Sequence, residues 1–178
     1  MRLVLPVFFL ISVLFLNETL ASKIKLTNVK CESFNQSWVT IDHCRLRAIN
    51  RYKTVCNINA TFHHPATKIK VRYQVLKRAN GYKPWLLDAT IDACAFMKKP
   101  NHPVGKIIYN MIKNCSTVTH TCPYVGLQYV KNFYVTPEQI PLPLPSGDYA
   151  LFLTWLFSDK PQFATNVYFT FTEDLLKQ

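Results

Sequence analysis

Polar and apolar residues alternate along several stretches of the chain, and this alternation predicts β-strands. From residue 52 to residue 63, one face carries apolar side chains and the other carries lysine, asparagine and threonine. A period of two with one polar face is typical of a half-buried antiparallel strand. The pattern recurs over 68–75, after a turn predicted at His64-Pro65, and over 85–93, after Asn80-Gly81, a pair that favours hairpins. The residues predicted to face inward are Tyr52, Cys56, Ile58, Ala60, Phe62, Ile69, Val71, Tyr73, Val75, Trp85, Leu87, Ala89 and Ile91.

The C-terminal half continues with strand patterns. Residues 124–135 form one strand, and residues 149–157 are apolar on both faces except at Thr154. A strand with two apolar faces is covered on both sides or has one face on a cavity. Prolines recur between 137 and 145, which predicts an extended connection without ladder hydrogen bonds. After a turn at 158–161, a last strand is predicted to face inward with Phe163, Val167, Phe169 and Phe171.

One segment changes to helical spacing. Its apolar positions recur every three or four residues, which predicts a short helix over about 103–114, with Asn101 as its cap and Pro103 in its first turn. Together these patterns predict a mainly β fold, an immunoglobulin-like antiparallel β-sandwich of about eight strands with one short helix. Residues 22–178 are expected to form a single domain.

The N-terminus has the pattern of a secretory signal peptide over residues 1–21. Arg2 is followed by a run of 14 residues, 3–16, that is apolar except at Ser12, and by the small residues Thr19 and Ala21 before the expected cleavage site. No later apolar segment is long enough to cross a membrane as a helix. We therefore expect a secreted, extracellular protein that is soluble and not membrane-spanning.

Secretion changes how the cysteines are interpreted. An even number of cysteines in an oxidising compartment predicts three disulfides, and fifteen pairings are possible, between which the sequence alone does not decide. Sequons predict glycosylation at Asn35 and Asn59, while the sequon at Asn114 is less favourable because its middle residue is a cysteine. The six cysteines are Cys31, Cys44, Cys56, Cys94, Cys115 and Cys122.

Catalytic and metal-binding patterns are weak throughout. His63 and His64 are adjacent, so on a strand they point to opposite faces and do not form a metal pair. Asp88 and Asp92 share a face but lie ~13 Å apart at the rise of a strand, too far for a glycosidase pair. A cystine at Cys122 explains that residue better than a nucleophile beside His120. We expect neither an enzyme nor a cofactor or metal site.

The charge distribution suggests a partner for one surface. The formal net charge is +11, and residues 23–113 carry 17 Lys and Arg against 4 Asp and Glu. Such a face is either simply solvated or attracts an acidic receptor, an acidic glycan or an anionic lipid surface. No compact nucleic-acid motif is present, so nucleic acid is not an expected partner. The residues predicted on outer strand faces are Lys53, Lys68, Lys70 and Arg72.

Four stretches together resemble a family of secreted insect proteins, expanded in flies and mostly of unknown function, that includes chemosensory proteins of the CheB type. They are Asn28 to Cys31; Asn80 to Leu86 leading to Asp92 to Phe96; His120 to Tyr124; and Pro145 to Tyr149 leading to Trp155. The family is distantly similar to ML (lipid-recognition) β-sandwich proteins, which hold an apolar ligand between two sheets. One departure is that the last strand here has no cysteine to tie it.

The resemblance also bears on the disulfides and on the ligand. It implies the pairs Cys31–Cys44 and Cys94–Cys122 and leaves Cys56–Cys115 as the third pair, with the ML-type hairpin bond Cys115–Cys122 as the rival. It implies a binding protein for an apolar small molecule or lipid, with a chemosensory role as one form of it. The alternative is an extracellular protein-recognition module with a dry core that uses its basic face. The side chains expected to line a cavity, or else to fill an ordinary core, are Phe62, Val71, Tyr73, Trp85, Phe133, Leu153, Trp155 and Phe169.

Overall fold

The computed structural model describes residues 22–140 and 144–173, so the predicted signal peptide lies outside the described residues. In this part of the chain, eight strands form two antiparallel sheets, which confirms the predicted sandwich-like β fold. The strands are β1 Lys23–Ser33, β2 Val39–Ala48, β3 Thr54–Ala66, β4 Ile69–Ala79, β5 Gly81–Asp92, β6 Tyr124–Phe133, β7 Gly147–Phe157 and β8 Lys160–Thr172. Two helices, α2 Ala93–Lys98 and α3 Pro103–Ile112, and a 3₁₀ turn, η1 Pro137–Gln139, complete the described elements.

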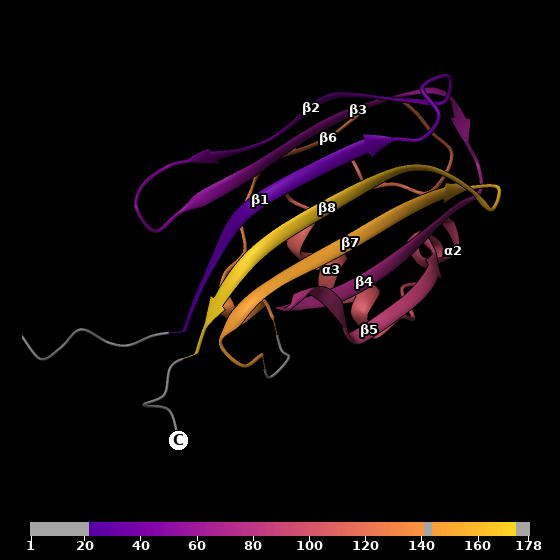
Figure 1. Cartoon of the computed structure of the whole chain (residues 1–178). Helices are drawn as coiled ribbons and strands as arrows, with labels where there is room; N and C mark the ends of the chain where they lie inside the picture. Colours follow the sequence, from indigo (N-terminus) through magenta and orange to yellow (C-terminus); the bar gives the residue numbers. More distant parts are fainter. Residues whose placement is uncertain (1–21, 141–143, 174–178) are drawn as a thin grey trace, which may run out of the picture.

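The two sheets differ in width. The larger sheet has the strand order β1-β8-β7-β4-β5, and the smaller one has the order β2-β3-β6. In Figure 1 the smaller sheet lies over the β1 side of the larger sheet, while α2 and α3 lie beside β4 and β5. The disulfide Cys31–Cys44 ties β1 to β2 and so links the sheets along that side.

Two of the predicted turns are confirmed and one is wrong. Asn80 follows β4, and Gly81, with φ +87°, opens β5, as the Asn80-Gly81 pair predicts. The β7–β8 hairpin turns at Ser158 and Asp159, which both adopt positive φ, as a tight hairpin requires. The predicted turn at His64-Pro65 is instead the end of β3. The chain tolerates Pro65 there because the β3–β6 pairing skips from Phe62 to Ala66, so no ladder hydrogen bond needs its missing N–H.

Every residue predicted to face inward is buried or half-buried except Tyr52. Cys56, Ala60 and Phe62 are buried on β3, whereas Tyr52 precedes the strand and is 70% exposed. The charged groups of Arg51 and Lys23 lie 5.9 and 6.0 Å from the centroid of the Tyr52 ring. The predicted inner face of the last strand is also found, with Phe163 and Phe171 buried on β8.

The helical prediction needs two corrections. Helix α3 matches the predicted segment but ends at Ile112, and its cap is the His102 side chain, which accepts a hydrogen bond from the Gly105 N–H at 3.3 Å, rather than Asn101. Helix α2 was not predicted. Its N-terminal cap is Asp92, whose side chain accepts a hydrogen bond from the Ala95 N–H at 2.8 Å. The helix follows β5 directly, so the alternating pattern of that strand hides where the helix begins.

The proline-rich connection also differs from the extended form that was predicted. Its first part is the η1 turn, in which Thr136 and Gln139 form a capping box, and residues 141–143 lie outside the described residues. The Gln139 side chain accepts a hydrogen bond from the Thr136 N–H at 2.9 Å. A proline at the first position of a helical turn loses no hydrogen bond, so Pro137 favours this compact start.

Two of the three expected disulfides are present. Cys31–Cys44 and Cys94–Cys122 join positions whose Cα atoms lie 6.1 and 5.5 Å apart, as the family resemblance implies. The third bond is a wrong prediction, because Cys56 and Cys115 are free thiols. Cys56 is packed into the core beneath β1, while the Cys115 thiol follows α3 and donates to the Ile112 carbonyl at 3.3 Å. In the described part of the chain, no helix is long and apolar enough to cross a membrane.

Candidate apolar site between the two sheets

The smaller sheet packs against Ile69 and Val71 of β4, while the α3 region contacts β4 at Tyr73 and β5 at Ile91. The Tyr73 ring of β4 meets the His102 ring at the start of α3, with centroids 6.0 Å apart. Gly105 lies against β5 and α2, so closely that a methyl group there would come within 3.2 Å of Ile91 and 3.0 Å of Phe96. The missing side chain of Gly105 therefore lets α3 approach the sheet edge that the smaller sheet does not reach.

Burial along the inner face of β7 falls from the ends toward the middle. Tyr149 and Phe157, at the two ends of the row, are 0% and 3% exposed. Between them, Leu151, Leu153 and Trp155 keep intermediate exposure although they share the same inward face. In a fully packed sandwich the middle of the inner face would be its most buried part. The interior is therefore incompletely filled along this row.

The neighbouring strands show the same incomplete filling. On β5 the predicted inward residues alternate with exposed ones, as expected, but all four remain only half-buried. On β8 the inward residues near both ends of the strand are buried, whereas those in the middle are half-buried. The half-buried inward residues on these two strands are Trp85, Leu87, Ala89, Ile91, Val167 and Phe169.

The eight residues predicted to line a cavity separate into two groups. Phe62, Val71 and Tyr73 are buried. The other five are half-buried and border the packed clusters: Trp85, Phe133, Leu153, Trp155 and Phe169. The structure brings Trp85 and Phe169 together around Tyr149, at ring distances of 5.3 and 5.5 Å, and places Trp155 with Phe62 and Val71 in another cluster.

A tyrosine corner holds the start of β7. The Tyr149 hydroxyl donates a hydrogen bond to the Pro145 carbonyl at 2.6 Å. Such a corner, in which a buried tyrosine bonds the backbone a few residues upstream, recurs in β-sandwiches. Burial raises the pKa of Tyr149, with the nearby Glu173 adding to the effect, so the phenol stays protonated and remains a donor. The Pro145 to Tyr149 stretch singled out in the sequence therefore anchors one end of the interior.

A second hollow was not predicted from the sequence. A cavity of about 170 Å³, half open to solvent, lies between α2, α3 and the segment before β6. None of the eight predicted residues borders it, and the unpredicted helix α2 contributes Phe96 and Met97 to its wall. Its lining residues are Phe96, Met97, Pro100, Tyr109, Thr119, His120 and Thr121. A dry cavity of roughly 150 Å³ is large enough for one benzene ring, so this hollow has the size of a small ring or a short chain end.

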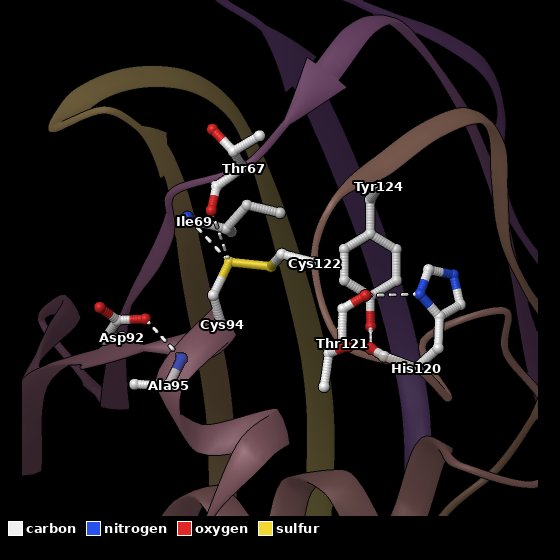
Figure 2. The surroundings of a disulfide bond; sticks show 9 residues. All are labelled: Thr67, Ile69, Asp92, Cys94, Ala95, His120, Thr121, Cys122 and Tyr124. Carbon is white, nitrogen blue, oxygen red and sulfur yellow. Dashed lines mark hydrogen bonds between the residues drawn. A yellow bond between two sulfur atoms is a disulfide. The ribbon is translucent and has the colours of Figure 1, made fainter.

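The Cys94–Cys122 bond fixes the flank of this hollow (Figure 2). The bond joins the start of α2 to the segment before β6, and the peptide bond between Cys122 and Pro123 is cis. The His120 ring stacks on Tyr124 with centroids 4.4 Å apart, and the Tyr124 hydroxyl donates to the His120 carbonyl. Burial raises the pKa of Tyr124, so this donor is neutral at ordinary pH.

The outer face of the larger sheet carries paired charges. Arg72 donates to both carboxylate oxygens of Asp88, at 2.9 and 2.7 Å, and Lys70 lies 2.6 Å from Asp159. The hydrogen bond from Arg72 lowers the pKa of the Asp88 carboxyl. Part of the predicted basic face is thus neutralised by acidic neighbours.

Within residues 22–140 and 144–173, no three His, Cys, Asp or Glu side chains are grouped to hold a metal ion.

Comparison with known proteins gives one finding. Residues 71–151, less than half of the chain, match the family described as "Protein of unknown function (DUF1091)". The matched stretch runs from β4 through both helices and β6 into β7, so it includes the tyrosine corner and the second hollow. No curated protein matches the chain.

Proposed function

We propose that this is a secreted binding protein that holds a lipid or another apolar small molecule between its two sheets, without changing it chemically. The observation that carries the proposal is the row on β7, where Leu151, Leu153 and Trp155 face inward yet are only half-buried, between the buried residues Tyr149 and Phe157. An apolar ligand would complete the burial that the protein's own side chains leave unfinished.

The energetics are adequate for such a ligand. Burial contributes roughly 0.8 kcal/mol per methylene group, so a 14-carbon chain gains about 11 kcal/mol. Lost translational freedom and side-chain ordering oppose this by about 4–15 kcal/mol. At the low end of this cost, the net gain of about 7 kcal/mol corresponds to a Kd of several micromolar without specific polar contacts. At the high end, burial of the chain alone does not suffice and polar contacts are needed. The proposal needs no catalytic group.

Secretion rests on separate observations. Two disulfides are in keeping with an oxidising compartment, and the first 21 residues have the pattern of a signal peptide. A chemosensory role, with a pheromone-like ligand, is part of the proposal through the resemblance to CheB-type proteins. The aromatic side chains beside the half-filled interior suit a ligand of that apolar kind.

The alternative is a recognition module that uses a basic face. The ion pairs of Lys70 and Arg72 leave less free charge on that face than the sequence suggests. We therefore favour the apolar ligand, and binding through the basic face becomes an outcome of the test.

Native mass spectrometry after gentle purification from a secreting host tests the proposal. We expect an apolar adduct that is lost on organic extraction, and saturable binding of a fluorescent fatty acid by the extracted protein. A clean apo mass, no probe binding and salt-sensitive retention on heparin would overturn the proposal and support the recognition module.

A further inference from the structure

The inward row of β4 ends in a lysine. Residues 69 to 77 pair with β7 without a break, so Ile69, Val71, Tyr73, Val75 and Lys77 all face the interior. The first three are buried, Val75 is half-buried, and Lys77, opposite Tyr149, is half-buried as well. A cation thus occupies the last inward position at the tyrosine-corner end of the half-filled interior.

Aromatic rings and a glycine form the surroundings of this lysine. The Lys77 ammonium lies 5.6 Å from the ring centroids of both Trp85 and Tyr149. A side chain at Gly147 would begin 3.3 Å from the Lys77 Cε and 4.0 Å from its nitrogen. The glycine therefore leaves space beside the ammonium group. Rings within about 6 Å hold a cation in place but do not neutralise it.

No carboxylate pairs with Lys77 in the described part of the chain. The three ion pairs there use Lys70, Arg72 and Arg78. Glu173 is close enough to Tyr149 to raise its pKa, yet forms no ion pair with Lys77. Instead, a second lysine, Lys83, stands directly opposite Lys77 in the β4–β5 register. Like charges facing each other across strands are destabilising, and an anion between them would remove that cost.

From this arrangement we infer that the ligand is a single-tailed amphiphile whose anionic head group binds to Lys77, with Lys83 beside it. This inference rests on the proposed function and specifies its ligand class. The head group is a carboxylate, sulfate or phosphate, and the tail lies along Val75, Leu151 and Leu153 toward Trp155. Six residues of extended strand separate Lys77 from Val71, the partner of Trp155, which gives about 20 Å for the tail.

The test compares a 16-carbon fatty acid carrying a fluorophore at its methyl end with the methyl ester of the same probe. In the native protein we expect the acid to bind more tightly than the ester. Lys77→Met should weaken binding of the acid about tenfold or more, the effect of one lost charge-assisted hydrogen bond, and should leave binding of the ester unchanged. Lys77→Arg should retain most of the preference for the acid.

Lys131→Met is the matched control. Lys131 also lies over an aromatic ring, 4.3 Å from the centroid of Tyr129, but it belongs to the smaller sheet, on β6. Its removal deletes the same charge and the same kind of ring contact and should change neither affinity. An alkyl sulfate of the same length that competes with the labelled acid, in a manner dependent on Lys77, would further support the inference.

The outcomes separate the two proposals. If the ester and the acid bind equally well, or if Lys77→Met leaves the preference for the acid unchanged, the anionic head-group site is wrong while the apolar site stands. If neither probe binds to the native protein or to Lys77→Arg, the proposed function itself is wrong, and the head-group inference falls with it.

Discussion

The indole ring of Trp155 lies flat against the ring of Phe163, with the centroids 5.3 Å apart and the planes only 2° from parallel. The indole N–H donates to the Thr165 hydroxyl at 3.1 Å, which fixes the ring's position across the β7–β8 pair. Phe163 is buried and belongs to the core, whereas Trp155 is only half-buried. The stack therefore joins the packed end of the interior to its unfilled middle.

Replacement of Trp155 by alanine tests whether this residue acts mainly as part of the packed core or as part of the unfilled interior. A fully buried aromatic residue costs about 3–5 kcal/mol when it is truncated, and we expect that for Phe157→Ala at the buried end of the row. Trp155→Ala should cost less, because its site is already partly open, but should weaken binding of the fatty-acid probe more than Phe157→Ala does. Urea denaturation of the apo proteins and probe titration measure both effects. A large stability loss in a protein that never binds probe would contradict the carrier function.

Removal of the tyrosine-corner hydroxyl should destabilise the fold modestly. Tyr149→Phe keeps the buried ring but deletes the hydrogen bond to the Pro145 carbonyl. A typical hydrogen bond of this kind contributes about 0.5–1.5 kcal/mol, which urea denaturation resolves. Tyr129→Phe is a control, because its ring lies on β6, away from the corner. Equal midpoints for the native protein and Tyr149→Phe would show that the corner bond contributes nothing.

The two free thiols should differ in reactivity. Burial, reinforced by the neighbouring Cys115, raises the pKa of Cys56 to about 12, while Cys115 is less buried and its pKa is raised less. A thiol reagent at neutral pH should therefore modify Cys115 first and reach Cys56 only on unfolding.

The raised pKa of Cys56 also sets a pH dependence. The neutral thiol favours the folded state, so its contribution to stability is complete below the unfolded pKa near 9.0 and is lost as the pH rises toward about 12.

Non-reducing peptide mapping should find the disulfides Cys31–Cys44 and Cys94–Cys122, with Cys56 and Cys115 as free thiols. A bond that includes Cys56 or Cys115 would contradict this assignment.

The Asp88 carboxyl should titrate below its usual range. Its hydrogen bonds from Arg72 and Gln74 favour the charged form, so the interaction is complete above the unfolded pKa and is lost as the pH falls through the lowered, folded value. Arg72→Met should raise the Asp88 pKa measured by NMR toward the ordinary value. The matched variant Arg78→Met, which removes the ion pair of Asp148, should leave Asp88 unchanged.

Most of the strand architecture was predictable, because on most strands the inward residues alternate with polar ones, although β7 is apolar on both faces. The β4–β5 and β7–β8 hairpins and the inner face of β8 follow from that period and from turn residues. Helix α2 was missed because it has only six residues, too few to show a helical period beside the strand that precedes it. The sequence feature that could have indicated this helix is Asp92, whose side chain accepts a hydrogen bond from the Ala95 N–H and caps the helix.

The site itself was predictable only in part. A sequence pattern identifies inward residues but not how completely the opposite layer covers them. For this reason Tyr73 and Trp155 looked equivalent in the sequence, although the first is buried beside His102 and the second is only half-buried. Lys77 was overlooked for a related reason. The predicted strand stopped at residue 75, and its extension to Ala79 is what turns the lysine inward.

The attachment of α3 has a consequence for how the interior exchanges its contents. In the described part of the chain, the helix is joined to the larger sheet by side-chain contacts at Tyr73 and Ile91, while its backbone hydrogen bonds stay within the helix and its adjoining turns. Because the helix and the strand ladders share no backbone hydrogen bonds among the described residues, we expect them to open as separate units. Movement of the helix away from β4 and β5 breaks no inter-strand hydrogen bond. Amide hydrogens of α3 should exchange with solvent faster than those of β7, because access to the interior does not require the sandwich to unfold.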